Sequence, residues 1–236
     1  MPKVSVITTL YNYKNYIEES IKSFISQDFV NSEMIIIDDC STDNPYEVIK
    51  KYKNNRVKYI RLDKKSNYSH AKNVGIKESS SDILVMLDAD DFLTPHSIKI
   101  RYSKIMEGYD FVHGFALDYK DGRKYPNRLK KEWNRKKSWK YIHAQGVMLK
   151  KKIHRKIGLY DEDLWCKSDR EFFARVWHHH FKIGTVDDFV VMYRRHKKQM
   201  HRSKEKMKVN NKLQKIVLNK INCRKKDLSG LLFLGK

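Results

Sequence analysis

Three carboxylates stand close together in the sequence, directly after a run of five apolar residues. The apolar run is residues 83–87 (ILVML), and the acids are Asp88, Asp90 and Asp91. Such an uninterrupted apolar run predicts a strand buried on both faces of a parallel sheet. Ligands of open α/β sheets bind outside the carboxyl ends of the strands, so the acids are expected in a binding crevice. An Asp-x-Asp motif there can share a hard divalent cation that also binds substrate phosphates.

The same acids could simply cap the helix that follows them. The pair Thr94-Pro95 argues against this alternative, because it already offers an N-cap and a first-turn proline for a helix that runs to Glu107. We therefore interpret the motif as a site for metal and phosphate.

Strands and helices are predicted to alternate along the first half of the chain. The predicted strands are residues 4–10, 34–37, 57–62 and 83–87. Helices are predicted from Asn15, where Glu18 completes a capping box, from the Asn44-Pro45 pair, and over residues 69–77. This alternation is typical of a parallel, doubly wound sheet with right-handed crossovers.

Polar side chains follow two further strands at the same predicted edge of the sheet. Thr8, Thr9 and Tyr11 come from the end of the first strand, and Asp39 follows the second. An aromatic ring can stack on a base there, and an aspartate can accept a hydrogen bond from a base N–H or a ribose hydroxyl. The chain has no Gly-x-Gly-x-x-Gly and no Walker-type lysine loop, which disfavours a dinucleotide fold or a P-loop. We predict a nucleotide pocket whose diphosphate is neutralised by metal and cationic side chains.

Four blocks of the chain, in this order and spacing, resemble the family 2 glycosyltransferases. They are residues 4–12 (VSVITTLYN), 36–43 (IIDDCSTD), 69–76 (SHAKNVGI) and 87–91 (LDADD). The resemblance covers residues 3 to about 93, and it implies a GT-A fold that binds a nucleotide. It also implies an inverting transfer of a sugar from a nucleotide diphosphate donor.

The resemblance assigns roles to individual residues. Asp39 would bind the base, Asp88 would touch the ribose or the metal shell, and Asp90 would ligate the metal. The predicted donor-binding set is Thr8, Thr9, Tyr11, Asp39, Lys72, Asp88, Ala89 and Asp90. Lys72 stands where the family commonly has arginine, which keeps the charge but loses the bidentate fork, and Cys40 stands where glycine is common. Asp39 could instead cap a helix beside Ser41 and Asp43, and Tyr11 could be an ordinary packing residue.

The second half of the chain holds the predicted acceptor side. We expect strands at residues 109–117 and 145–149, and a short basic helix at 150–156. Residues 158–173 resemble the family's acceptor segment, in which an acidic residue opens a helix and acts as general base. That residue would be Asp169, with Ser168 where glutamate is common. Asp169 could also be an ordinary carboxylate in the first turn of a helix.

A hairpin of residues 182–186 and 189–193 is predicted to lead into the basic loop 194–201. In relatives such a loop closes over the diphosphate, so His196, with His201 second, is a candidate metal ligand. A surface histidine in a basic run is the alternative. Trp133 and Trp139 lie in the basic segment 123–141, where they could stack on sugars or nucleic acid, or anchor a solvated loop.

The composition bounds the class of protein and its surroundings. The 236 residues are 40% hydrophobic, which fits a globular chain, and the net charge is +22. Such an excess implies a polyanionic neighbour, namely nucleic acid, an anionic membrane or a phosphate-bearing acceptor, although a lysine-rich composition alone could account for it. Cys40, Cys166 and Cys223 are odd in number and widely spaced, so we expect neither disulfides nor a zinc site, but a reducing cytoplasm. We also expect no signal peptide and no membrane span.

These observations combine into one prediction. Residues 1–200 form a GT-A α/β domain, a Rossmann-like, mostly parallel sheet flanked by helices, with a nucleotide half (1–93) and an acceptor half (94–200). Residues 201–236 form a basic helical extension that could lie on an anionic membrane or dock on protein. The domain is a metal-dependent (Mn²⁺ or Mg²⁺) inverting transferase that uses a nucleotide-sugar, most simply a UDP-sugar, and a glycan or anionic acceptor. It is cytoplasmic, or peripheral on the inner membrane face. The alternative is a nucleic-acid-binding protein or a nucleic-acid glycosyltransferase on the same scaffold.

Overall fold

A computed structural model describes residues 3–126, 128–136, 138–164 and 167–199. Its first half is a parallel sheet in the order β3-β2-β1-β4. The strands are β1 (Val4–Leu10), β2 (Ser32–Asp38), β3 (Val57–Arg61) and β4 (Ile83–Asp88). The register sets Thr9 beside Asp88, and Leu10 beside Asp38. Polar residues at the carboxyl ends of three strands therefore meet at one edge, as the sequence predicts.

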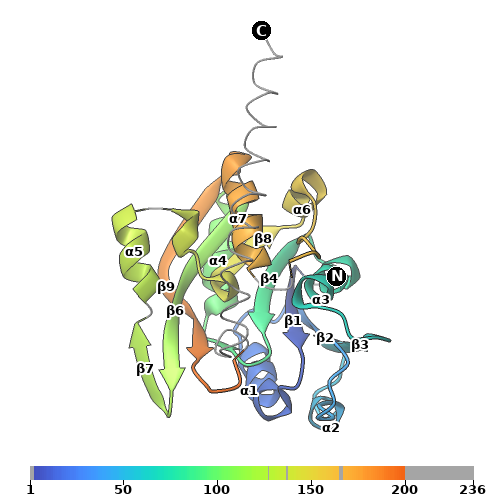
Figure 1. The fold of residues 1–236 in the computed structure, drawn as a ribbon. Coiled ribbons are helices and arrows are strands. Elements are labelled where there is room, and N and C mark those ends of the chain that lie inside the picture. The colour runs from blue at the N-terminus through green and yellow to red at the C-terminus, as the bar shows by residue number, and fades with distance from the viewer. Residues whose placement is uncertain (1–2, 127, 137, 165–166, 200–236) are drawn as a thin grey trace.

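The second half of the chain extends the same sheet with mixed strand directions. β8 (Val147–Lys150) runs antiparallel to β4, and β6 (Phe111–Lys120) lies between β8 and β9 (Ile183–Arg194). The short β5 (Phe92–Leu93) pairs with β9, and β7 (Arg123–Pro126) pairs with β6. The pairing of β6 with β9 is parallel, so both strands end on the side of the Asp88 loop (Figure 1).

Helices cover both faces of the sheet because consecutive residues of the central strands, which point to opposite faces, are buried and mostly apolar. One core holds Val6 and Val85 together with α1 and α4, and the other holds Ile7 and Met86 together with α3, α6 and α7. The helices are α1 (Lys14–Ile25), α2 (Tyr46–Ile49), α3 (Tyr68–Glu78), α4 (Ser97–Met106), α5 (Arg128–Lys136), α6 (Lys152–Ile157) and α7 (Ser168–His178). Two short 3-10 turns, η1 (Trp139–Tyr141) and η2 (Ala144–Gly146), precede β8.

Two predicted helix caps are wrong. α1 begins at Lys14 without a side-chain cap, and the Lys14 N–H donates to Asp43 Oδ2 at 2.8 Å instead. α4 begins at Ser97, while Thr94 Oγ1 donates to the backbone oxygen of Phe189 at 2.7 Å. In both places a hydrogen bond to a residue distant in sequence is made instead of the predicted local cap. Because α4 starts six residues after Asp91, the acids of the Asp88 loop do not cap it either.

The predicted hairpin of residues 182–193 is also wrong. β9 is one strand, and its register against β6 shifts between His113 and Ala116. Asp187 and Asp188 suggest a turn in the sequence, but they are exposed residues at this irregularity, which bends the strand without reversing it.

The basic segment 123–141 folds as β7, α5 and η1. Trp133 is buried in the core against His113, with ring centres 4.2 Å apart, so it anchors the segment. The predictions for the 201–236 extension, His201, Cys166 and Cys223 concern residues outside those the structure describes. Within the described ranges, no helix has the length and apolar character needed to cross a membrane.

Candidate active site

The acidic loop after β4 gathers three carboxylates into one small volume. Oxygens of Asp88, Asp90 and Asp91 all lie within 4.8 Å of one another. A backbone bond from the Asp91 N–H to the Asp88 oxygen, 3.0 Å long, folds the loop into a tight turn. Thr9 Oγ1 on β1 donates to Asp88 Oδ1 at 3.4 Å, as the strand register requires. This set of hard oxygen ligands suits a divalent cation.

Asp88 is held by donors from distant parts of the chain. The Tyr68 hydroxyl on α3 donates to Asp88 Oδ1 at 2.7 Å, and the Gln145 amide in η2 donates to Oδ2. Burial raises the pKa of Asp88 to about 6, with the Asp90 charge adding to the shift and Lys72 opposing it. No motif or spacing in the sequence indicated that Tyr68 or Gln145 belongs to this site.

This pKa shift links the stability of the metal-free protein to pH. The unfolded carboxyl has an ordinary pKa of 3.8 against about 6 when folded, so the folded state binds the proton more tightly. The resulting stabilisation is present below the unfolded pKa and is lost as pH rises through 6. We expect the free energy of unfolding of the wild type, relative to Asp88→Asn, to fall by about 1 kcal/mol between pH 5 and 7. Urea unfolding in EDTA measures this difference, and a pH-independent difference would contradict the shift.

Asp91 and Asp90 are held against the end of β9. Asp91 is 1% exposed; its Oδ1 accepts the Arg194 N–H at 2.9 Å, while its Oδ2 has no hydrogen-bond partner among the described residues. Burial, with the charges of Asp90 and Asp88, raises the pKa of Asp91 well above its usual range. Arg194 Nε donates to the Asp90 backbone oxygen at 2.9 Å. A buried carboxylate oxygen without a donor is costly, and a bound cation would satisfy it.

His196 lies beside this cluster, where the sequence predicted a metal ligand. Its Nε2 is 3.0 Å from Asp90 Oδ2, and its ring packs on Tyr16 with centres 4.4 Å apart. Tyr13 packs edge-on to the same ring. To ligate a metal through Nε2, His196 would exchange its contact with Asp90 for the cation.

Lys72 is a buried cation for which the described residues supply no counter-ion bond. It is 2% exposed, and its Nζ has no hydrogen-bond partner among the described residues. The rings of Tyr68 and Tyr160 lie 4.0 and 4.8 Å from it. Burial lowers the pKa of Lys72, opposed by the charges of Asp88 and Asp169. An ammonium kept out of water in this way fits a site for an anion such as a diphosphate.

Asp169 lies in the first turn of α7, half-buried, as predicted. Its charge raises the pKa of Tyr68 and opposes the shift of the Lys72 pKa, so Asp169 lies near these two side chains. A buried pair on the next turns holds the helix in place. Arg175 bonds Glu171 and donates to the Leu159 backbone oxygen at 2.7 Å.

The predicted base pocket brings Tyr11 and Asp39 together. Asp39 Oδ1 accepts from the Ser66 N–H at 2.6 Å and from its hydroxyl at 2.8 Å, so Asp39 is not a helix cap. Tyr11 is 42% exposed, which rules out ordinary packing. Lys65 pairs with Asp39 and lies over the Tyr11 ring. Cys40 has a φ of 60°, the left-handed conformation that glycine adopts most easily, which explains why glycine is common there.

Thr8 does not reach this pocket. It is fully buried, on the strand face that Val6 and Leu10 share, and its hydroxyl has no partner among the described residues. Thr9, on the opposite face, is the threonine that reaches Asp88.

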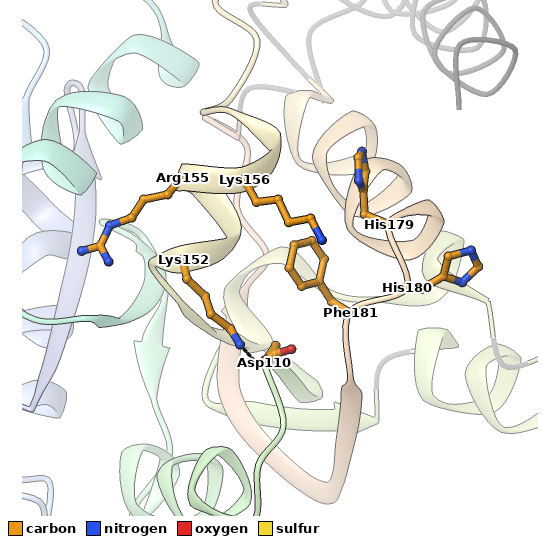
Figure 2. Close-up of a pocket in the computed structure, with 7 residues that line it drawn as sticks. All are labelled: Asp110, Lys152, Arg155, Lys156, His179, His180 and Phe181. Carbon is orange, nitrogen blue, oxygen red and sulfur yellow. Dashed lines mark ion pairs between the residues drawn. The ribbon is translucent and has the colours of Figure 1, made fainter. Parts of the chain in front are cut away.

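A hollow of about 500 Å³ lies beside α6 and the residues just before β6 and β9 (Figure 2), and these strands begin at the end of the sheet away from the Asp88 loop (Figure 1). Lys152 and Lys156 from α6 line it, with His179 from the end of α7. Lys152 is paired with Asp110 at 2.7 Å. Arg155 extends away from Lys152 and Lys156 (Figure 2) and pairs with Asp82 at 2.7 Å. The cationic groups diverge, and none of them belongs to the Asp88 cluster.

Comparison with known proteins identifies the family. The family model described as glycosyl transferase family 2 matches residues 5–160. The chain belongs to glycosyl transferase family 2. The match covers β1 to Tyr160 and so includes Tyr11, Asp39, Lys72 and the Asp88 loop, whereas Asp169 and His196 lie beyond it.

Curated relatives in family 2 match at moderate identity. The uncharacterized glycosyltransferase YwdF of Bacillus subtilis is 29% identical over 182 residues, which are 73% of this chain and 67% of YwdF. The poly(ribitol-phosphate) beta-N-acetylglucosaminyltransferase TarS of Staphylococcus aureus is 26% identical over 213 residues, 86% of this chain and 37% of TarS. The chain therefore spans about two thirds of YwdF and little more than a third of TarS.

Solved structures share the fold. The crystal structure of S. aureus TarS 1–349 in complex with UDP superposes with a TM-score of 0.72 at 24% identity, over 83% of this chain and 61% of that one. The complex with UDP-GlcNAc gives a TM-score of 0.71 at 22% identity, over 84% and 60%. The family 2 chain thus has the GT-A fold that the sequence blocks predict.

Proposed function

We propose that this chain transfers a sugar from a UDP-sugar to a hydroxyl group, with a divalent cation and with inversion at the sugar carbon. One observation carries the proposal. Oxygens of Asp88, Asp90 and Asp91 lie within 4.8 Å of one another at the carboxyl end of β4, near the buried ammonium of Lys72, which has no hydrogen-bond partner among the described residues. Clustered acids next to a buried cation suit a metal-bound diphosphate.

The donor would lie along the edge formed by β1, β2 and β4. Tyr11 stacks on the base, Asp39 accepts its N–H, and Asp88 contacts the ribose or the metal shell. Lys72 neutralises the diphosphate. UDP is the nucleotide supported best, since TarS, which shares the fold, is known in complex with UDP and with UDP-GlcNAc.

The residues present fit Mn²⁺ or Mg²⁺. Asp90 and Asp88 would hold the cation, His196 could add a nitrogen ligand, and Asp91 offers Oδ2, which has no hydrogen-bond partner among the described residues. When bound, such a cation acts as a Lewis acid that stabilises the charge of the departing diphosphate.

Asp169 would act as the general base. It takes the proton of the acceptor hydroxyl while the acceptor oxygen forms a bond to the sugar carbon. The bond from that carbon to the diphosphate oxygen breaks, and UDP leaves with the electron pair. A single displacement of this kind inverts the configuration. The position of Asp169 at the start of α7, where its charge acts on Tyr68 and Lys72, supports this role.

The acceptor is proposed to be a glycan or another anionic molecule. The net charge of +22 supports an anionic partner, and TarS is named for transfer to poly(ribitol-phosphate). The burial of Trp133 removes one support for stacking on nucleic acid, so sugar transfer to a glycan is the preferred function. In this proposal residues 1–200 are the catalytic domain and residues 201–236 an extension that contacts an anionic surface.

The cleavage of UDP-sugars tests the proposal without knowledge of the acceptor. We expect slow release of UDP from at least one UDP-sugar in Mn²⁺, with water as acceptor, and loss of that release in EDTA. A panel of UDP-sugars, with GDP- and CDP-sugars for comparison, measures it. Release that is indifferent to metal, or absent with every nucleotide-sugar, would contradict the proposed function.

A further inference from the structure

Lys65 lies between the two side chains that the proposed function assigns to the base. It belongs to the loop between β3 and α3, its Nζ forms an ion pair with Asp39 Oδ2, and that Nζ is 3.9 Å from the centre of the Tyr11 ring. Asp39 Oδ1 is already taken by the Ser66 N–H and hydroxyl. The open edge of the carboxylate is therefore Oδ2, and an ammonium donor sits beside it.

An acceptor and a donor side by side match only some base edges. Uracil presents N3–H next to its 4-carbonyl, and guanine presents N1–H next to its 6-carbonyl. Cytosine and adenine present the reverse, a ring nitrogen acceptor next to an amino group. Asp39 with Lys65 therefore complements a base edge that has an N–H beside a carbonyl. Against cytosine or adenine, the Asp39 acceptor would meet the ring-nitrogen acceptor and the Lys65 donor would meet the amino-group donor, which disfavours these bases.

We propose that Lys65 is a specificity residue that reads the 4-carbonyl of uracil while Asp39 accepts the N3–H. The inference rests on the proposed function, and it adds a residue and a reason for the choice of base. Arriving over Tyr11, the base would shift the ammonium from the face of the tyrosine ring to the edge of the base.

The side chain of Lys65 is suited to this movement. It is 45% exposed, against 5% for Asp39, so it is free to shift within the loop while the carboxylate stays fixed by Ser66. An ammonium has three N–H donors and can therefore keep Asp39 as one acceptor while it donates to the base carbonyl. The ion pair is retained, so the base gains a charged hydrogen bond without breaking one.

The test is calorimetric titration of UDP and CDP, in Mn²⁺, into the wild type, Lys65→Met and Lys65→Gln. UDP and CDP differ only at the base edge in question. Lys64→Met is the matched control, because Lys64 is exposed on the same loop and loses the same charge. We expect Lys65→Met to lower the affinity for UDP about tenfold and the affinity for CDP by less than about threefold, so the preference for UDP over CDP falls. Lys64→Met should leave both affinities within about twofold.

Each contrary outcome has a distinct meaning. If the wild type binds UDP but the Lys65 variants keep the same preference over CDP, or bind both nucleotides more tightly, Lys65 is merely displaced by the base and the inference is overturned. The proposed function would then still stand. If the wild type binds neither nucleotide in Mn²⁺, the proposed donor site and this inference both fail. Near-UV circular dichroism of each variant confirms that it is folded.

Discussion

Asp169→Asn is expected to lower kcat for sugar transfer by about 10²- to 10⁴-fold, while the affinity for UDP stays within about twofold. Asparagine keeps the shape of the side chain but cannot take the proton of the acceptor hydroxyl, and general bases contribute rate factors of this size. Asp169 lies at the start of α7 and acts on Lys72 through its charge, so its replacement should leave the donor groups in place. Initial rates of transfer or of UDP release, together with UDP titrations, measure both quantities.

Asp163→Asn is the control for the general base. Asp163 is an exposed acid in the same acceptor segment, six residues earlier, and its replacement should leave kcat within about twofold. If Asp169→Asn keeps a near-normal kcat, or lowers the affinity for UDP by as large a factor as it lowers kcat, Asp169 is not the base.

Asp90→Asn is expected to weaken UDP binding in Mn²⁺ by about a hundredfold and to lower turnover by about 10²- to 10³-fold. The substitution removes a charged oxygen ligand but keeps the size of the side chain. In EDTA the wild type and the variant should bind UDP equally weakly, because the lost affinity belongs to the metal. Calorimetry in both buffers measures the difference.

Asp90→Asn should not lower the stability of the folded state. Asp90 raises the pKa values of Asp88 and Asp91, so removing its charge relieves repulsion among buried acids. The free energy of unfolding in EDTA should therefore be equal to or greater than that of the wild type. Asp188→Asn, at an exposed position on β9, is the control and should change neither binding nor stability. Metal-dependent UDP binding that survives Asp90→Asn would remove Asp90 from the metal site.

The sequence predicted those site residues that directly follow a recognisable strand. Buried strands are recognisable as apolar runs, and the acids and Tyr11 follow those runs directly. Asp39, Asp88 and Asp90 could therefore be placed at one sheet edge. The same pattern could not show which face of β1 each threonine occupies. Thr9 reaches Asp88, whereas Thr8 points into the core.

The residues that sequence reasoning missed are those brought in by long-range contacts. Asp88 is bonded by Tyr68, 20 residues away, and by Gln145, 57 residues away, and Asp39 is paired with Lys65, 26 residues away. No spacing rule links such partners. The wrong caps have the same cause, because Lys14 and Thr94 take partners from other elements. The predicted hairpin failed because two exposed aspartates mark an irregularity in β9 as readily as they mark a turn.

The most direct test of the proposed donor site is anomalous X-ray scattering from crystals grown with Mn²⁺ and UDP. We expect one manganese peak between the Asp88 and Asp90 carboxylates and the diphosphate, with the diphosphate near Lys72 and the uracil ring over Tyr11. A peak elsewhere, such as in the basic hollow lined by Lys152 and Lys156, or UDP bound away from Tyr11, would contradict the assignment of the donor site.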